Sequence, residues 1–240
     1  MTEPVALAWS GGRDSALALW ELRRRGGRVV ALLTTVGQDD GRVTMHGVPG
    51  PLLRRQAGAL RLPLVEVAIP APCPDAVYEA RMAAALARPP LDGVGRIAFG
   101  DLFLVDVRAY REERLTAAGR CAEFPLWGSD TTELAHRFLD LGFAAVVTCV
   151  DTRRLDRSFA GRPFDAALLG ALPPGVDPCG ERGELHTFVF DGPGFSSPVA
   201  HEVVGVVEWD GYAVADLAVP RSAGGGPAPA LIDLGPEPTV

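Results

Sequence analysis

The sequence contains no lysine, because all 23 basic residues are arginine. A Walker A loop needs a lysine on the β- and γ-phosphates, so that class of nucleoside triphosphate hydrolase is excluded. A pyridoxal phosphate Schiff base, a kinase-type ATP lysine and a lysine nucleophile are excluded on the same ground. Any phosphate groups that this chain binds must therefore be held by arginine, backbone N–H groups and metal ions.

Long apolar runs and a leader are also missing. No run reaches the roughly 18 residues that a membrane-spanning helix needs, and the first residues lack the basic segment and apolar stretch of a signal peptide. These absences predict a cytoplasmic protein with no membrane partner. The formal net charge is −7 and the arginines are scattered, apart from residues 23–25, so a long nucleic acid is not expected as the main partner.

The four cysteines form no Cys-x-x-Cys pair, and their spacing matches no zinc site. Cys121 and Cys149 lie in apolar runs, so we expect both to be buried, reduced thiols. Cys179 lies in a polar, glycine-rich loop, and it is the one cysteine whose position leaves a functional role open.

The first half of the chain alternates short β-rich runs with helical segments. This alternation is typical of an α/β fold with a Rossmann-like, doubly wound parallel sheet. Ligands of such sheets bind at the carboxyl ends of the strands, so the loops after the first, second and fourth strands should converge on one site. The predicted strands are Val5–Trp9, Val29–Val36, Leu64–Ile69, Arg96–Phe99 and Cys121–Phe124, and the predicted helices are Ser15–Arg25, Pro51–Arg61, Asp75–Ala87 and Val105–Ala118.

The segment Pro125–Gly128 indicates a boundary between two domains. We therefore expect an α/β domain over residues 1–125 and a smaller α+β domain over residues 126–218. Residues 219–240 are rich in Gly, Pro and Ala, which predicts a loose tail. In the second domain the predicted helices are Thr131–Leu141 and Phe164–Leu169, and the predicted strands are Ala144–Val150, Leu185–Phe190 and Val199–Trp209.

The most informative stretch joins the first predicted strand to the first predicted helix. Its two glycines let an anion approach the backbone closely, and the helix start presents N–H groups to that anion. An aspartate beside a phosphate repels it unless a cation lies between them, so Asp14 predicts Mg²⁺ bound with a nucleotide. The alternative is a strand-to-helix joint that serves packing alone. The residues of this loop are Ser10, Gly11, Gly12, Arg13, Asp14 and Ser15.

A second polar group follows the fourth predicted strand, at Gly100 and Asp101. Asp101 is predicted to point into the shared crevice as a metal or substrate contact or to cap the next helix, and these two roles are compatible. Tyr110 and Arg114 lie four residues apart and so share one face of that helix. Arg114 either lines the site or forms only a surface ion pair. His46, in the loop after the second strand, is either a rim residue of the site or a structural histidine.

The third group is a glycine-punctuated loop that leads into the predicted strand Leu185–Phe190. On a strand, Glu184 and His186 would point to the same side. Together with Glu181 and Thr187 they are too polar for core positions, which favours the wall of a site over a solvated hairpin.

Together these blocks resemble the diphthine–ammonia ligase family, also described as an adenine nucleotide alpha hydrolase family. The loop at residues 10–15 matches the PP-loop signature Ser-Gly-Gly-x-Asp-Ser, in which x is commonly Lys and is Arg13 here. Many enzymes share the PP-loop, whereas the glutamate-rich block Gly180–Phe188, followed by Asp191-Gly192-Pro193, is more specific. The other similar blocks are Met45–Val48, Gly100–Leu104 with Tyr110 and Arg114, and Pro125–Gly128.

The resemblance implies a PP-loop domain, a smaller domain over the nucleotide, and a reaction. ATP adenylates the carboxylate of diphthine, a modified histidine of elongation factor 2, and ammonia displaces AMP to give the amide. It also implies ATP and Mg²⁺ as cofactors, with Asp14 as the metal ligand and with residues 10–15, His46 and Gly100 around the nucleotide. The implied catalytic residues are Asp14, Asp101, Glu181, Glu184 and His186, and the implied acceptor contacts are Tyr110, Arg114, Glu181, Glu184 and Thr187.

The arginine-only composition and the Gly-Asp-Leu-Phe-Leu block resemble bacterial members of that family. Bacteria are not expected to make diphthamide, so the acceptor carboxylate is left open between a protein side chain and a small molecule. The source of ammonia and the oligomeric state, a homodimer included, are open as well.

Two other functions remain as alternatives. One is a PP-loop enzyme that modifies tRNA, which the missing Cys-x-x-Cys pair and the missing basic patch disfavour. The other is a non-catalytic protein that binds an adenine nucleotide without turnover.

Overall fold

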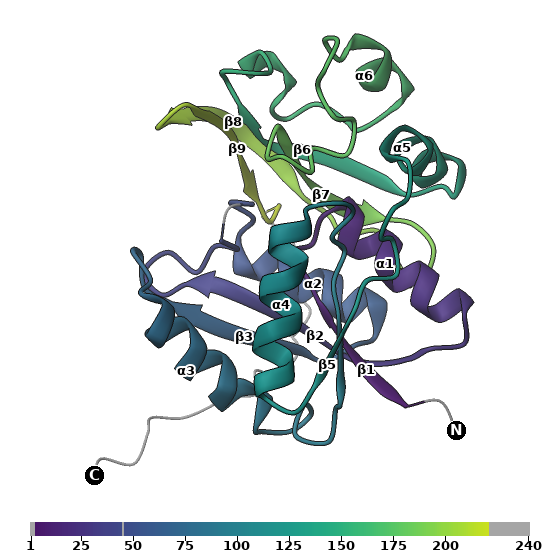
Figure 1. Ribbon diagram of the computed structural model, residues 1–240. Coiled ribbons are helices and arrows are strands. Elements are labelled where there is room, and N and C mark those ends of the chain that lie inside the picture. Colours follow the sequence, from purple (N-terminus) through teal and green to yellow (C-terminus); the bar gives the residue numbers. More distant parts are fainter. Residues whose placement is uncertain (1–2, 45, 221–240) are drawn as a thin grey trace.

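A parallel sheet forms the first part of the chain in the computed structural model, which describes residues 3–44 and 46–220 (Figure 1). The strands pair in the order β3-β2-β1-β4-β5. The order reverses beside β1, which places a ligand crevice at the carboxyl ends of β1 and β4. The strands are β1 (Pro4–Ala8), β2 (Arg28–Gly37), β3 (Leu64–Ile69), β4 (Arg96–Ala98) and β5 (Cys121–Glu123).

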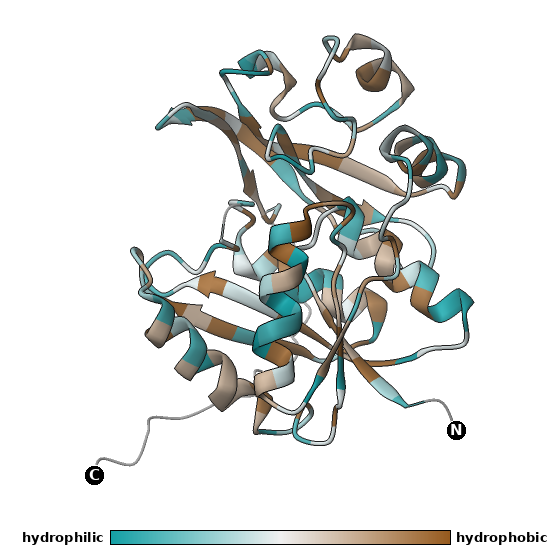
Figure 2. Cartoon of the chain, viewed as in Figure 1, coloured by the Kyte–Doolittle hydropathy of each residue, from teal (hydrophilic) through white to brown (hydrophobic). Residues whose placement is uncertain are grey.

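Helices cover both faces of this sheet because its strands are apolar on both sides. Leu7 and Leu32 face one apolar cluster, which includes residues of α1 (Arg13–Arg24) and α2 (Gly50–Leu60). Ala6 and Leu33 face the other, which includes residues of α3 (Asp75–Leu86) and α4 (Val105–Ala117). The predicted Rossmann-like, doubly wound α/β arrangement is therefore confirmed. Figure 2 shows the apolar residues gathered along the strands.

A second, antiparallel sheet has the strand order β7-β6-β9-β8. Its helical segments begin at side-chain caps, since Asp130 and Asp165 accept hydrogen bonds from the first turns of α5 and α6. The predicted smaller α+β unit is thus present. Its elements are α5 (Thr131–Asp140), β6 (Ala144–Asp151), the 3₁₀ helix Arg157–Phe159, α6 (Ala166–Ala171), β7 (Leu185–Asp191), β8 (Glu202–Trp209) and β9 (Tyr212–Ala218).

The two sheets meet at α1, which lies between them in Figure 1. One apolar cluster continues from Leu7 and Leu17 of the first unit to Val147 and Phe188 of the second. Backbone pairing adds to it, because the Val189 N–H donates to the Gly11 carbonyl at 2.9 Å. The start of α1 is therefore fixed against both units, and any site there is shared by both.

Two expectations about the fold need correction, and one strand was missed. Cys121 is exposed rather than buried, because β5 is an edge strand of the parallel sheet, whereas Cys149 is buried as predicted. The predicted strand Val199–Trp209 begins only at Glu202, and β9 was not predicted at all. A signal for β9 exists, since Asp210 and Gly211 both have positive φ (50° and 79°) and form the Asp-Gly turn of a hairpin.

The predicted tail, residues 219–240, lies outside the described residues except for its first two. Among the helices of the described residues, none combines the length and the apolar character needed to cross a bilayer.

Candidate active site

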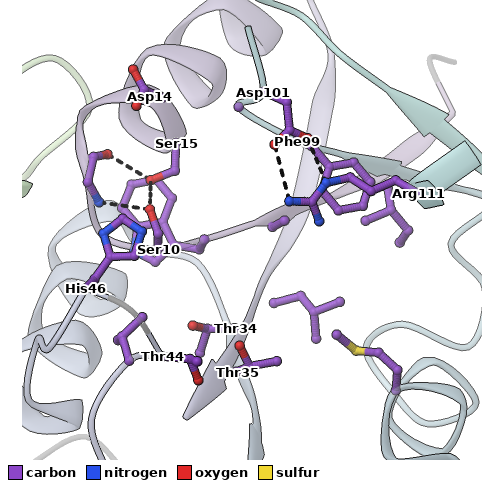
Figure 3. A pocket seen from close by; sticks show the side chains of 18 of the residues that line it. Ser10, Asp14, Ser15, Thr34, Thr35, Thr44, His46, Phe99, Asp101 and Arg111 are labelled. Carbon is purple, nitrogen blue, oxygen red and sulfur yellow. Dashed lines mark hydrogen bonds and ion pairs between the residues drawn. The ribbon is translucent and has the colours of Figure 1, made fainter. Parts of the chain in front are cut away.

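A cavity of about 660 Å³ opens at the carboxyl ends of β1, β2 and β4. Loops after these three strands line it, which confirms that they converge. The second unit closes it with residues 179–181 and 185–187. Figure 3 shows Ser10, Asp14 and Ser15 on one side, Asp101 and Arg111 on the other, and threonines of β2 and the following loop below them in the view. Of the predicted site residues, all but Gly11 and Glu184 line this cavity.

The loop between β1 and α1 is held in shape by its two serines (Figure 3). Ser15 Oγ donates to the Gly12 carbonyl at 2.8 Å, and the Gly12 N–H donates to Ser10 Oγ at 3.3 Å. Among the described residues, the Ser15 N–H has no acceptor in the protein, whereas the Asp14 N–H bonds to its own carboxylate. An unpaired N–H group at a helix start, with the helix dipole behind it, suits an anion.

Gly100 brings the end of β4 directly against this helix start. A Cβ on Gly100 would lie 2.9 Å from the Asp14 carbonyl carbon and 3.1 Å from the Ser15 nitrogen. Only glycine permits that approach, because both contacts are with backbone atoms. The loop at residues 10–15 and the loop that carries Asp101 therefore lie in direct contact.

Gln56 of α2 joins the loop to the second sheet, and it was not predicted from the sequence. Its side chain is 0% exposed. Its Nε2 donates to the carbonyls of Gly11, at 2.9 Å, and Val189, while its Oε1 accepts from Trp9 Nε1 at 3.0 Å. Gly11 has a positive φ of 79° and directs its carbonyl to these partners, which explains why it lies outside the cavity.

Replacing Gln56 by Leu should lower the free energy of unfolding by about 2–3 kcal/mol, because buried polar partners lose their hydrogen bonds. Urea denaturation measures the change. Gln38→Leu is the control, since Gln38 is exposed at the end of β2. Equal stability of the two variants would contradict the role given to Gln56.

Asp14 faces the cavity with a side chain that is 29% exposed, and Arg13 pairs with both of its oxygens, at 3.0 and 3.2 Å. Burial raises the pKa of Asp14 despite the attraction of Arg13. In the described part of the chain, no three His, Cys, Asp or Glu side chains gather to hold a metal ion by themselves. Asp14 keeps lone pairs that Arg13 leaves free, so it fits a Mg²⁺ ion that brings phosphate and water ligands with it.

Glu181 closes the cavity from the second unit. Its Oε1 accepts from the N–H groups of Leu102, at 2.7 Å, and Phe103, at 3.3 Å. Burial, with contributions from the negative charges of Asp14 and Asp101, raises the pKa of Glu181 to about 7. This carboxyl group therefore changes its protonation state near neutral pH.

Asp177, a further residue that was not predicted, shapes the turn that ends in Glu181. Its two carboxylate oxygens accept from the N–H groups of Cys179, at 3.0 Å, and Glu181, at 3.1 Å. The Cys179 thiol is buried, and burial raises its pKa. It donates to the Thr131 carbonyl at 3.1 Å, so in this fold it is a packing residue.

Two histidines meet at the cavity wall, with the rings of His46 and His186 4.4 Å apart. Burial and the nearby Arg13 charge lower the pKa of His186 to about 4. Burial and His186 lower the pKa of His46 well below its usual value. Both rings are therefore neutral at neutral pH, and the buried Nδ1 of His46 has no partner among the described residues.

Asp101 forms an ion pair with Arg111, whose Nε lies 2.7 Å from its Oδ2. It does not cap the next helix, because the cap of α4 is Leu104. The prediction that Asp101 caps a helix is therefore wrong, whereas Asp101 does line the cavity as predicted. Tyr110 and Arg114 do share a face, with the guanidinium 5.3 Å from the ring centre.

Arg114 also pairs with Glu79 at 2.8 Å, and both side chains are substantially exposed. Both residues of the pair line the cavity, so Arg114 forms a surface ion pair and also faces the cavity. An exposed pair of this kind adds little stability.

Glu184 and Thr187 are buried, contrary to the expectation that they are too polar for core positions. Glu184 lies before the first residue of β7, pairs with Arg154 at 3.3 Å and accepts from the Arg182 N–H at 3.0 Å. It therefore points away from the cavity that His186 lines. Thr187 Oγ1 accepts from the Arg13 N–H at 3.0 Å.

The part of the cavity between α3 and α4 is apolar. Its floor comes from strands of the parallel sheet, and its walls come from the two helices. Such a surface suits a flat, weakly polar ring better than a charged group. The apolar lining residues are Leu33, Met82, Leu86, Ile97, Phe99 and Leu115.

These features define an α/β protein with a cavity at the start of its first helix and a second unit that closes the cavity. A model of the diphthamide synthase N-terminal domain matches residues 3–116, and a model of the diphthamide synthase C-terminal domain matches residues 130–213. The chain belongs to the diphthamide synthase family, as its resemblance to diphthine–ammonia ligases predicted. No curated protein is similar enough to count as a relative.

Proposed function

We propose that the protein is an ATP-dependent ligase that converts a carboxylate into an amide with ammonia. An oxygen of the acceptor carboxylate attacks the α-phosphorus of ATP, and the bond to pyrophosphate breaks. The nitrogen of ammonia then attacks the acyl carbon, the bond to AMP breaks, and the nitrogen loses one proton. The products are the amide, AMP, pyrophosphate and that proton.

The start of α1 supports the binding of the ATP phosphates. Ser15 offers a free backbone N–H group, and Ser10 adds a hydroxyl group beside it. Asp14 would hold Mg²⁺, which supplies neutralisation of phosphate charge. The apolar region that includes Ile97 and Met82 suits the adenine ring.

The position and the pKa of Glu181 are the observation that carries the proposal. Its carboxyl group, with a pKa of about 7, lies in the same cavity as the proposed anion site. A general base works best when its pKa lies near the working pH. Glu181 would take the proton that the attacking nitrogen loses, while the neutral His186 contributes a hydrogen bond rather than a charge.

The acceptor would enter at the rim formed by Tyr110 and Arg114. Tyr110 is 39% exposed and both residues line the cavity. The positive charge of Arg114 would attract a carboxylate toward the site, although its pair with Glu79 weakens that attraction. Both residues stay predicted acceptor contacts.

The test is a product analysis with purified protein, ATP, Mg²⁺ and ¹⁵N-labelled ammonium. Elongation factor 2 bearing diphthine and a panel of amino-acid carboxylates serve as acceptors. We expect AMP and pyrophosphate in equal amounts, and ¹⁵N in the product amide. Release of ADP and phosphate, or bound ATP without AMP for every acceptor, would contradict the proposal, and the second result would favour a nucleotide sensor.

A further inference from the structure

Arg13 occupies the variable position of the PP-loop, yet its side chain does not face the anion site. The side chain is only 1% exposed. Its Nη1 donates to the Pro178 carbonyl at 2.8 Å, and its Nη2 donates to the Cys179 carbonyl. Its Cζ lies 4.9 Å from the ring centre of Phe164. All three partners belong to the second unit.

The backbone of Arg13 also binds the second unit, because its N–H donates to Thr187 Oγ1. Burial disfavours a charged guanidinium, but the neighbouring Asp14 carboxylate outweighs it and the pKa of Arg13 is raised. The charge is therefore kept inside the protein and balanced there. A phosphate could reach it only if these contacts were broken.

The two carbonyls that Arg13 holds lie in the turn that Asp177 shapes and that ends in Glu181. This turn is anchored again where Glu181 accepts the Leu102 N–H. Arg13 thus connects the start of α1 to the segment that presents the Glu181 carboxyl group.

We propose that Arg13 is a positioning residue, which locks the turn at residues 177–181 onto the PP-loop and so fixes Glu181 relative to the nucleotide phosphates. This inference rests on the proposed function only in treating residues 10–15 as the nucleotide loop. Arginine suits the task because its planar group can bind two carbonyls and a carboxylate at once, whereas a lysine ammonium cannot span them.

Hydrogen exchange of nucleotide-free protein tests the lock. In Arg13→Lys and Arg13→Gln, we expect amides of residues 177–188 to exchange about tenfold faster than in the wild type, as the loss of one to two hydrogen bonds allows. The matched control is Arg54→Lys, because Arg54 makes a two-point pair with Glu66 outside the cavity. Unchanged exchange in both Arg13 variants would overturn the proposal.

ATP affinity separates this role from phosphate binding. We expect the Kd for ATP to stay within about threefold of the wild type in Arg13→Gln, while kcat for the acceptor falls; a loss of affinity beyond tenfold would overturn the proposal. If the variants do not fold, the carbonyl ¹³C NMR signal of Pro178 in the wild type decides, because this carbonyl accepts from Arg13 Nη1 and lies outside the cavity lining; ATP should leave the signal unmoved, and a large shift would overturn the proposal. Wild-type protein that binds no ATP would refute the proposed function, and the exchange result would still decide the lock.

Discussion

Glu181→Gln should lower the rate of amide formation by at least about 100-fold, because a positioned general base contributes that much or more. The substitution keeps the shape of the side chain and its capacity to accept from the Leu102 N–H, but it removes the group that takes up the proton. The Kd for ATP should stay within about threefold, since Glu181 lies outside the loop at residues 10–15. Single-turnover kinetics and calorimetry measure the two quantities.

The matched control is Glu113→Gln, which removes an exposed carboxylate from α4. Its rate should equal that of the wild type. Amide formation at the wild-type rate in Glu181→Gln would exclude Glu181 as the base and leave the proton to water or substrate.

The pH profile gives an independent readout of Glu181. Because its pKa is raised to about 7, the wild-type rate should rise with pH through about 7 as the carboxyl group loses its proton. Ammonium loses its proton to give more free ammonia at higher pH, so each rate is divided by the concentration of free ammonia. After that correction the rise should be absent in Glu181→Gln.

The raised pKa of Glu181 also predicts how the free energy of unfolding depends on pH. Folded Glu181 keeps its proton up to about pH 7, whereas in the unfolded chain the group titrates near its ordinary pKa of 4.5. The folded state therefore binds more protons between these values, and the free energy of unfolding falls as pH rises through this window. His186 acts in the opposite direction between pH 6.5 and about 4, where the unfolded state binds more protons and stability falls as pH falls.

Local patterns in the sequence predicted the first unit well because its elements are defined locally. Buried parallel strands appear as continuous apolar runs, and the loop at residues 10–15 carries its own small and polar residues. The crevice followed from topology, since the carboxyl ends of parallel strands share one edge. The prediction of the second unit was poorer because the turn signal at Asp210-Gly211, which precedes β9, was not used.

The contacts that hold the site together could not be predicted in this way. Gln56 bonds to Gly11 and Val189, which lie 45 and 133 positions away. Arg13 reaches Pro178 over 165 positions. A polar residue within a helix gives no local sign of such partners. Glu184 was predicted to be a site residue because the sequence does not show that it pairs with Arg154 in the fold. The catalytic and acceptor roles assigned from the family resemblance stay predictions.

Gly100→Ala should weaken ATP binding by about 100-fold, because a displacement of about 1 Å near a reacting or binding group can have that effect. The φ angle of Gly100 is not positive, so its backbone conformation is open to alanine. The obstacle is the steric clash of the added Cβ with neighbouring atoms. The new Cβ would lie 2.9–3.1 Å from backbone atoms of Asp14 and Ser15, and backbone cannot rotate away as a side chain can. The start of α1 must therefore move, together with the N–H group proposed to bind phosphate.

The control for Gly100→Ala is Gly95→Ala, at the opposite end of β4. A Cβ on Gly95 would meet nothing within 4 Å, so affinity and stability should match the wild type. Gly100→Ala should also cost about 1–3 kcal/mol of unfolding free energy through overpacking, which urea denaturation measures. Because the lock through Arg13 joins the same helix start to the Glu181 turn, hydrogen exchange at residues 177–188 should rise as well. Unchanged ATP affinity with a lowered stability would show that the contact serves packing and that the phosphates bind elsewhere in the cavity.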